Sequence, residues 1–355
     1  MKIHNFSAGP SILPQEVFQE ASQGVLNFQN SGLSILEISH RSKNFVEVME
    51  EAMSLVRELL TLSDDYEVLF VSGGASTQFL MAPMNCLPED RTACYVDSGV
   101  WAAKAIKEAK LFGNVEVLAS SKERDYTYIP KDYRVPTDAA YLHLTSNNTI
   151  FGTQCHQFPT TDVPIVCDMS SDIFSRPLDL TKFGIIYAGA QKNMGPAGTT
   201  LVIVRKDMLN RVERSIPSML NYSTHITQRS MFNTPPVFPV YVSMLTMRWL
   251  RDRGGIPYAQ ARNTAKAKLL YEEIDRNPLF KGFAEIQDRS EMNATFVLQD
   301  SDLENRFLDA CAEAGCSGIK GHRSVGGFRA SMYNAMPPDS VEVLVQVMRD
   351  FEKNV

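Results

Sequence analysis

Short apolar runs alternate with helix-like stretches through the middle of the chain. The run YEVLFVS at 66–72 has the composition of a strand, and residues 76–86 follow it with helical spacing. A helical pattern also spans 101–112. Further strand candidates occur at 92–97, 115–120, 139–145, 164–170, 184–189 and 199–204. Their apolar character is nearly continuous, which is typical of strands covered on both faces, so the pattern predicts an α/β sheet flanked by helices.

The pattern becomes helical from about Val237 and then changes to a mixed order. A helix is expected up to the glycine pair at 254–255, and a second at about 257–276, before Asn277 and Pro278. Then follow a strand at 293–299, a helix at 303–315, a strand at 328–334 and a helix at 340–353. This order predicts a smaller α+β C-terminal domain. No Pro/Gly-rich linker marks the boundary, so the pattern alone gives 16–255 as the large domain and 1–15 with 256–355 as the small one.

The composition is that of an ordinary globular protein of about two domains. The chain has 355 residues, of which 44% are hydrophobic and 21% charged, and a formal net charge of −6. This acidic balance argues against a sequence-independent nucleic-acid binder. No segment has the roughly 20 apolar residues of a membrane span, and the N-terminal residues lack the apolar stretch of a secretory signal. We therefore expect a cytoplasmic protein with neither nucleic acid nor a membrane as partner.

Six cysteines are scattered along the chain without a CxxC pair. Several lie in apolar runs, so we expect reduced, mostly buried thiols and no structural metal site. They are Cys86, Cys94, Cys155, Cys167, Cys311 and Cys316.

Lys192 and Asp168 are the candidate chemical groups. Lys192 follows a strand candidate in the small-residue segment YAGAQKNMGPAG, where partial desolvation would lower its pKa and free a nucleophilic amine. Asp168 ends the apolar run PIVCD, where a buried carboxylate needs a cationic partner. Their separation fits one strand, a crossover and the next strand, so both could lie at one edge of a sheet. Taken singly, each also fits an ordinary role, as a solvated surface lysine and as a turn or helix cap.

Several motifs in order carry a resemblance to a known family. They are FSAGPSILP at the start, SHRSKNF at 39–45, VSGGASTQF at 71–79, CDMSSDIFSRPLD at 167–179, YAGAQKNMGPAG at 187–198, SMFNTPP at 230–236 and KGHRSVGGFRASMYNAMP at 320–337. The chain resembles the phosphoserine aminotransferases, which are class-V, fold-type I enzymes that use pyridoxal 5'-phosphate. The resemblance covers nearly the whole length. It implies a cofactor-binding large domain with a mostly parallel sheet and a homodimer with shared active sites.

The resemblance implies a role for each matching residue around the cofactor. Lys192 would hold the cofactor as a Schiff base and then act as general base, and Asp168 would pair with the pyridine nitrogen. Trp101 would stack on the ring, although it also fits a core tryptophan at helical spacing. Thr149 would contact the ring oxygen region. The cofactor phosphate would be bound by Ala75, Ser76 and Gln191, and by Asn233 and Thr234 of the neighbouring subunit.

Two groups of cations are the candidates for substrate binding. By resemblance, Arg329 would bind the α-carboxylate, while His40, Arg41, His322 and Arg323 would share the distal phosphate or carboxylate, the last two from the partner subunit. The implied reaction converts O-phospho-L-serine and 2-oxoglutarate to 3-phosphohydroxypyruvate and L-glutamate, in serine biosynthesis. The same cations suit 4-phosphohydroxy-L-threonine, which would add a role in pyridoxine biosynthesis.

Two positions depart from the family pattern, and three other functions stay open. Ser76 stands where some members have arginine, which would weaken distal phosphate binding or shift it to another residue, and Ala8 stands where a serine occurs. The first rivals are a cysteine desulfurase and an alanine–glyoxylate type aminotransferase. A cysteine desulfurase would need a cysteine suited to nucleophilic attack, and none is evident. An alanine-specific enzyme would have no use for the distal cations. The third is a non-catalytic protein on the same fold, which fold alone never excludes.

Overall fold

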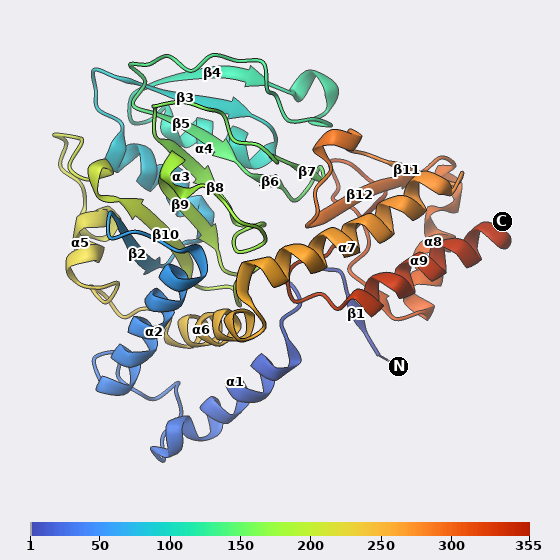
Figure 1. Ribbon diagram of the computed structural model, residues 1–355, viewed down its shortest axis with the longest axis horizontal. Coiled ribbons are helices and arrows are strands. Elements are labelled where there is room, and N and C mark those ends of the chain that lie inside the picture. Colours follow the sequence, from blue (N-terminus) through green and yellow to red (C-terminus); the bar gives the residue numbers. More distant parts are fainter. Residues whose placement is uncertain (1) are drawn as a thin grey trace.

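The computed structural model describes residues 2–355 and is built around one seven-stranded sheet (Figure 1). The strand order is β2 (Tyr66–Val71), β10 (Thr200–Arg205), β9 (Phe183–Gly189), β8 (Ile165–Asp168), β5 (Tyr141–Thr145), β3 (Thr92–Asp97) and β4 (Asn114–Ser120). Only β10 pairs antiparallel with both of its neighbours, β2 and β9, and the other pairs are parallel. The predicted strands and the mostly parallel sheet are confirmed. The antiparallel direction of β10 relative to β9 follows from the short connection between them, because short connections join antiparallel strands.

Helices cover both faces of this sheet, as the continuous apolar runs predicted. One core joins the sheet to α1 (Gln15–Asn27), α2 (Lys43–Leu60) and α6 (Val237–Asp252), and the other joins it to α3 (Gly74–Cys86), α4 (Val100–Ala109) and α5 (Tyr222–Thr227). Within β2, Val68 and Phe70 point to the first core, while Leu69 and Val71 point to the second. Because both faces of such a strand are buried, its residues do not alternate between apolar and polar.

The edge strand β4 differs from the expectation of burial on both faces. Its residues are exposed or half-buried, and the side chain of Val117 is 41% exposed. The apolar run at 115–120 predicted the strand correctly, but its burial was predicted wrongly. Within residues 2–355 only β3 pairs with β4, so one long side of this strand has no neighbour among them in the sheet.

The C-terminal part has its own core beside a three-stranded antiparallel sheet, β11 (Phe280–Gly282), β12 (Asn293–Leu298) and β14 (Phe328–Ser331). Helices α7 (Gly255–Arg276), α8 (Glu304–Glu313) and α9 (Pro338–Lys353) pack on it. The N-terminal strand β1 (His4–Asn5) pairs with β13 (Cys316–Ser317), so the chain start belongs to this core. The grouping supports the domain division at 16–255 and 1–15 with 256–355, which stays a prediction.

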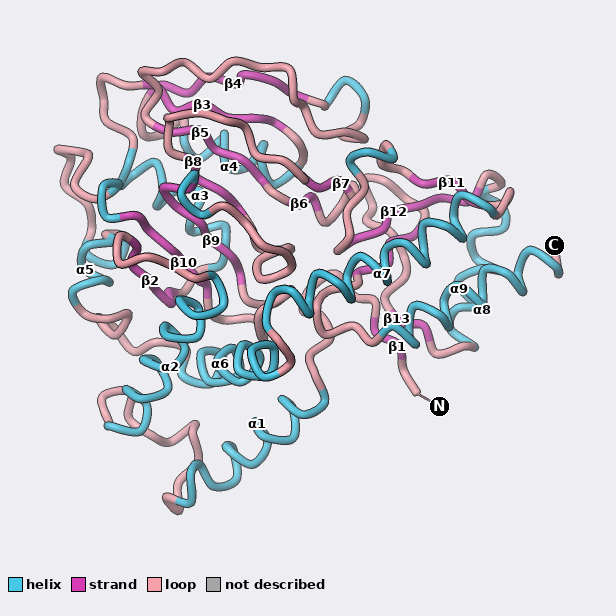
Figure 2. Tube along the Cα trace, in the orientation of Figure 1, coloured by secondary structure: helices cyan, strands magenta, loops and turns pink. Residues whose placement is uncertain are grey.

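The loops after the central strands meet the C-terminal part. Figure 2 shows the hairpin of β6 (Asn147–Asn148) and β7 (Thr153–Gln154), which follows β5, beside β12. Asn147 in β6 donates to Asn293 in β12 at 2.8 Å. Short 3₁₀ helices complete the structure at Phe28–Asn30, Lys122–Arg124, Leu180–Lys182, Lys206–Met208, Ser218–Leu220, Ile286–Asp288 and Ser301–Leu303. Across residues 2–355, no helix has the length and apolarity that crossing a membrane requires.

Candidate active site

Lys192 lies in the turn between β9 and β10, directly after the fully buried strand β9. Its Nζ donates to Thr149 Oγ1 at 2.6 Å. Loss of solvent lowers the pKa of Lys192 to about 8, although the attraction of Asp168 acts the other way. A lysine with this pKa has an uncharged, nucleophilic amine in an appreciable fraction of molecules near neutral pH.

Asp168 ends β8, the strand beside β9, and is buried. It pairs in register with Tyr187 of β9, so Asp168 and the turn that carries Lys192 lie at the same edge of the sheet. Its Oδ1 accepts the backbone N–H of Ser170 at 2.9 Å. Burial raises the pKa of Asp168, and Ser170 and Lys192 oppose this increase. The structure thus brings together the two residues that the sequence analysis placed at one sheet edge.

Trp101 lies beside this pair, in the first turn of α4. The Nζ of Lys192 is 5.5 Å from the centroid of the indole ring. The indole Nε1 is buried and has no hydrogen-bond partner within residues 2–355. The indole ring therefore lies over the amine of Lys192, a position that suits stacking on a ligand held there.

The N-terminal segment packs directly against the lysine turn. A Cβ at Gly9 would lie 3.3 Å from Lys192 Cγ, so this position has little room for a larger residue. The backbone N–H of Ser11 donates to the carbonyl of Gln191 at 3.0 Å. The carbonyl of Ala8 accepts a 2.6 Å hydrogen bond from the Tyr333 hydroxyl. The backbone of Ala8 thus serves a structural purpose without a side-chain hydroxyl.

A glycine turn between β2 and α3 forms a second part of the site. Gly73 and Gly74 have φ values of 101° and 67°, and no side chain caps the helix that begins at Gly74. An uncapped helix N-terminus presents backbone N–H groups to an anion. Ala75 and Ser76, the predicted phosphate contacts, occupy this first turn.

Asn233 lines a cavity together with Gly73 and Thr77 of its own chain. Asn233 and Thr234 are both exposed. The predicted contact of these two residues with a phosphate in the neighbouring subunit stays a prediction. Gln191 is half-buried, and its side chain lies over Gly189, where a Cβ would be 2.8 Å from Oε1.

The substrate cations divide into two places. Arg329 in β14 is half-buried, and its guanidinium donates to the carbonyl of Thr149 at 3.3 Å. Burial lowers the pKa of His322, and the charges of Arg329, Arg323 and Lys104 lower it further. Lys104 was missed in the sequence analysis, because an exposed lysine on a helix carries no distinguishing pattern.

His40 and Arg41 come from another part of the chain, the connection between α1 and α2. His40 is half-buried and Arg41 is exposed, with its backbone N–H donating to Ser39. His322 and Arg323 lie in the loop that leads into β14, the strand of Arg329. The predicted sharing of a distal anion across a subunit boundary stays a prediction.

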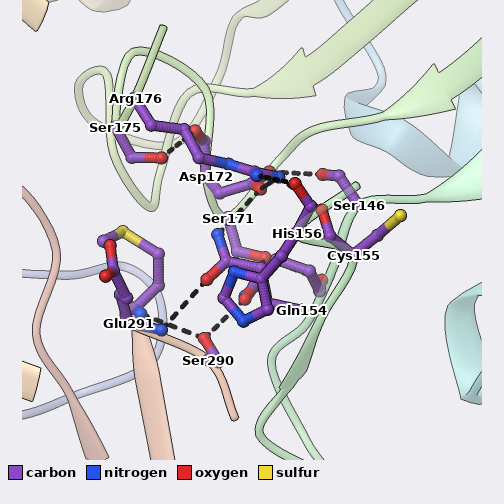
Figure 3. Close-up of polar contacts among 12 residues, drawn as sticks. Ser146, Gln154, Cys155, His156, Ser171, Asp172, Ser175, Arg176, Ser290 and Glu291 are labelled. Carbon is purple, nitrogen blue, oxygen red and sulfur yellow. Dashed lines mark hydrogen bonds and ion pairs between the residues drawn. The ribbon is translucent and has the colours of Figure 1, made fainter. Parts of the chain in front are cut away.

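A buried polar network holds the loop that follows Asp168 (Figure 3). Asp172 accepts hydrogen bonds from Ser146 and, at 3.2 Å, from Gln154, and it forms an ion pair with Arg176 at 3.6 Å. Gln154 in turn accepts the backbone N–H of Glu291 from the C-terminal part at 3.0 Å. The network ties the Asp168 loop to both parts of the chain. Asp172 was missed as a structural residue because its partners come from distant segments.

The fold and the site together define a class of enzyme. The family model of the class-V aminotransferases matches residues 3–344, and the chain belongs to this family. The phosphoserine aminotransferases of Flavobacterium johnsoniae and Flavobacterium psychrophilum are 62% and 61% identical to it, and each match covers 100% of both chains. The resemblance inferred from the motifs is confirmed, and the chain is an enzyme of the phosphoserine aminotransferase group.

Solved structures agree with this assignment. A phosphoserine aminotransferase from Bacillus circulans subsp. alkalophilus matches with a TM-score of 0.96 at 47% identity over 99% of both chains. Another, from Trichomonas vaginalis and solved with pyridoxal phosphate bound, matches with a TM-score of 0.94 at 38% identity, covering 98% of this chain and all of the other. An alanine–glyoxylate aminotransferase from Nostoc sp., at 16% identity, shares the fold alone.

The cysteine desulfurase alternative is not supported by the cysteines. All six are buried and unpaired, which confirms the expectation of buried thiols. Burial raises the pKa of both late thiols, to about 11 for Cys316 and further for Cys311. A thiol with a raised pKa is a poor nucleophile at neutral pH.

Proposed function

We propose that the chain binds pyridoxal phosphate and transfers the amino group of O-phospho-L-serine to 2-oxoglutarate. The observation that carries the proposal is the meeting of Lys192 and Asp168 at the ends of neighbouring strands, beside Trp101. The aldehyde of this cofactor needs an uncharged amine, its pyridine nitrogen a buried carboxylate, and its ring a flat apolar face. Lys192, Asp168 and Trp101 supply these three features.

The unpartnered groups also fit the cofactor. The uncapped start of α3, with the N–H groups of Ala75 and Ser76, suits the phosphate. Gln191, Asn233 and Thr234 are proposed as further phosphate contacts, the last two from a second subunit of a homodimer. Thr149, which already binds Lys192 Nζ, is proposed to contact the ring oxygen as well.

When bound, pyridoxal phosphate supplies an aldehyde that captures the substrate amine and a ring that withdraws electrons from the α-carbon. The carboxylate of Asp168 would pair with the ring nitrogen and favour its protonated form. Lys192, whose pKa is lowered to about 8, takes the proton from the α-carbon as general base. The hydroxyl of Thr149 lies 2.6 Å from the lysine amine and fixes its position.

The proposed substrate-binding cations suit a substrate that carries an anion at each end. Arg329 has a buried Nε without a partner within the described residues, so its guanidinium has capacity for an α-carboxylate. His322 and Arg323, with His40 and Arg41, are proposed to bind the distal phosphate or carboxylate. Glutamate and phosphoserine both carry anions at their two ends, so one set of cations can accept each in turn.

The proposed role is serine biosynthesis, with 4-phosphohydroxy-L-threonine as a second substrate whose conversion contributes to pyridoxine biosynthesis. The cations that hold phosphoserine suit this homologue, which adds one carbon bearing a hydroxyl. A cytoplasmic location is proposed with this role, and the six unpaired cysteines support it.

The test is a coupled assay of the purified protein loaded with pyridoxal phosphate. O-phospho-L-serine and 2-oxoglutarate are expected to give glutamate, whereas L-alanine in place of phosphoserine gives little, because it leaves the distal cations without a partner. 4-Phosphohydroxy-L-threonine is assayed in parallel. Equal rates with L-alanine and phosphoserine would contradict the proposed substrate class.

A further inference from the structure

A second lysine lies on the ring of Trp101. Lys104 follows Trp101 by about one turn of α4, and its Nζ is 4.6 Å from the indole centroid. Lys192 Nζ is 5.5 Å from the same centroid. Both amines therefore contact one indole ring, and Lys104 lies close to the reacting centre although it is an exposed residue.

The charge of Lys104 is not balanced by the chain. No carboxylate within residues 2–355 forms an ion pair with Lys104, and the same holds for Arg323 and Arg329. Ser76, in the glycine turn proposed for the cofactor phosphate, brings no charge. An excess of positive charge in one place is unfavourable unless an anion joins it.

The indole ring of Trp101 places Lys104 beside the site, because the amine of Lys192 lies over the same ring. Lys192 also binds Thr149, whose carbonyl accepts a hydrogen bond from Arg329. Lys104 further helps to lower the pKa of His322, one of the residues proposed to bind the distal anion. The distal group of the substrate is therefore the proposed partner of Lys104.

We propose that Lys104 is a specificity-determining residue that binds the distal group of the substrate and favours phosphate over carboxylate. A phosphate monoester carries between one and two negative charges near neutral pH, whereas a carboxylate carries one. An ammonium group on a flexible stem acts as a point charge, so it gains more from the more highly charged group. The inference rests on the proposed function, because it takes phosphoserine as the phosphorylated substrate.

The experiment compares Lys104→Gln with Lys104→Arg and with Lys107→Gln in the cofactor-loaded enzyme. Lys107 is a matched control, since it is another exposed lysine of α4 without an ion pair. For Lys104→Gln, the KM for phosphoserine is expected to rise about tenfold and that for glutamate about threefold or less. Lys104→Arg is expected to restore most of the preference, and Lys107→Gln to behave like the natural protein.

A second measurement separates binding of an anion from support of the Trp101 ring. Inorganic phosphate is expected to inhibit the glutamate half-reaction competitively, and Lys104→Gln to weaken this inhibition about tenfold. An equal rise in KM for both substrates, with unchanged inhibition by phosphate, would overturn the inference and leave Lys104 a support for the ring. If the natural protein does not turn over phosphoserine at all, the proposed function fails instead.

Discussion

Replacing Lys192 with methionine is expected to stabilise the cofactor-free protein at neutral pH. Removal from solvent lowers the pKa of this lysine from its ordinary 10.5 to about 8. A folded state that binds its proton more weakly than the unfolded chain is destabilised below pH 10.5, and by the full amount below about pH 8. The lowering corresponds to a penalty of about 3 kcal/mol at pH 7. Methionine has a similar length and carries no charge, so it removes this penalty.

Two interactions that the lysine makes bear on the size of this gain. Its Nζ donates to Thr149, and its charge attracts Asp168, whose pKa burial raises. The lowered pKa already includes the attraction of Asp168, so only the hydrogen bond to Thr149 is subtracted. Losing it is expected to cost about 1 kcal/mol, which leaves a net stabilisation of about 2 kcal/mol at pH 7. Between pH 8 and 10.5 the unfolded chain binds more protons than the folded state, so the penalty of the natural protein shrinks as pH rises.

Urea unfolding of both proteins at pH 7 and pH 9.5 measures this difference. The advantage of Lys192→Met is expected to fall by about 2 kcal/mol between the two values. Lys107→Met, at an exposed position in α4, serves as control and is expected to shift stability by less than about 0.5 kcal/mol at either pH. The reasoning would be refuted if the methionine variant were less stable than the natural protein at pH 7. It would also be refuted if the difference in stability between the two proteins were the same at both pH values.

Three further predictions test other parts of the site. Asp168→Asn is expected to lower turnover about 10³-fold, and to move the pKa of Lys192 below 8 because an attraction that raises it is lost; an unchanged kcat would contradict this role. Gly73→Ala is expected to lower the free energy of unfolding by about 2 kcal/mol, and Gly74→Ala by about 1 kcal/mol. Only the Cβ at position 73 would meet a side chain, that of Thr77. Equal losses for the two variants would contradict this reasoning. Asp172→Ala is expected to lower the free energy of unfolding by about 3 kcal/mol, because Arg176 loses its buried partner. As a control, replacing the exposed Asp162 with alanine is expected to lower it by less than about 0.5 kcal/mol. Equal urea midpoints for the two variants would argue against the network.

The central strands and the reactive pair could be predicted because local sequence determines them. A continuous apolar run such as that of β8 and β9 specifies a strand buried on both faces, and polar residues at the ends of such strands meet at one sheet edge. Asp168 and Lys192 follow this rule. The resemblance then assigned them to a cofactor, which the spacing alone did not identify.

Other features depend on contacts between distant segments. Helices α1 and α2 were not predicted, although Phe45, Val48, Met49 and Ala52 of α2 have the spacing of a buried helical face. The exposure of β4 depends on its position at the sheet edge, which the apolar run at 115–120 does not contain. Local patterns predict that a helix or strand forms more readily than they predict which elements pack against it.

Polar networks and clusters of like charge are the least predictable features. Asp172 binds Ser146 and Gln154, which come from the β5 end and from β7, and no local pattern links these positions. Lys104 becomes a candidate only because its amine and that of Lys192 lie over the same indole ring of Trp101. Both findings required coordinates of side chains that lie far apart along the chain.

Borohydride reduction of the pyridoxal phosphate-loaded protein, followed by peptide mass analysis, tests the central claim most directly. Reduction fixes the cofactor to whichever lysine holds it, and the account predicts the phosphopyridoxyl group on the peptide that contains Lys192. Attachment to another lysine, such as Lys104, or visible absorption that persists in Lys192→Ala, would contradict the assignment of Lys192.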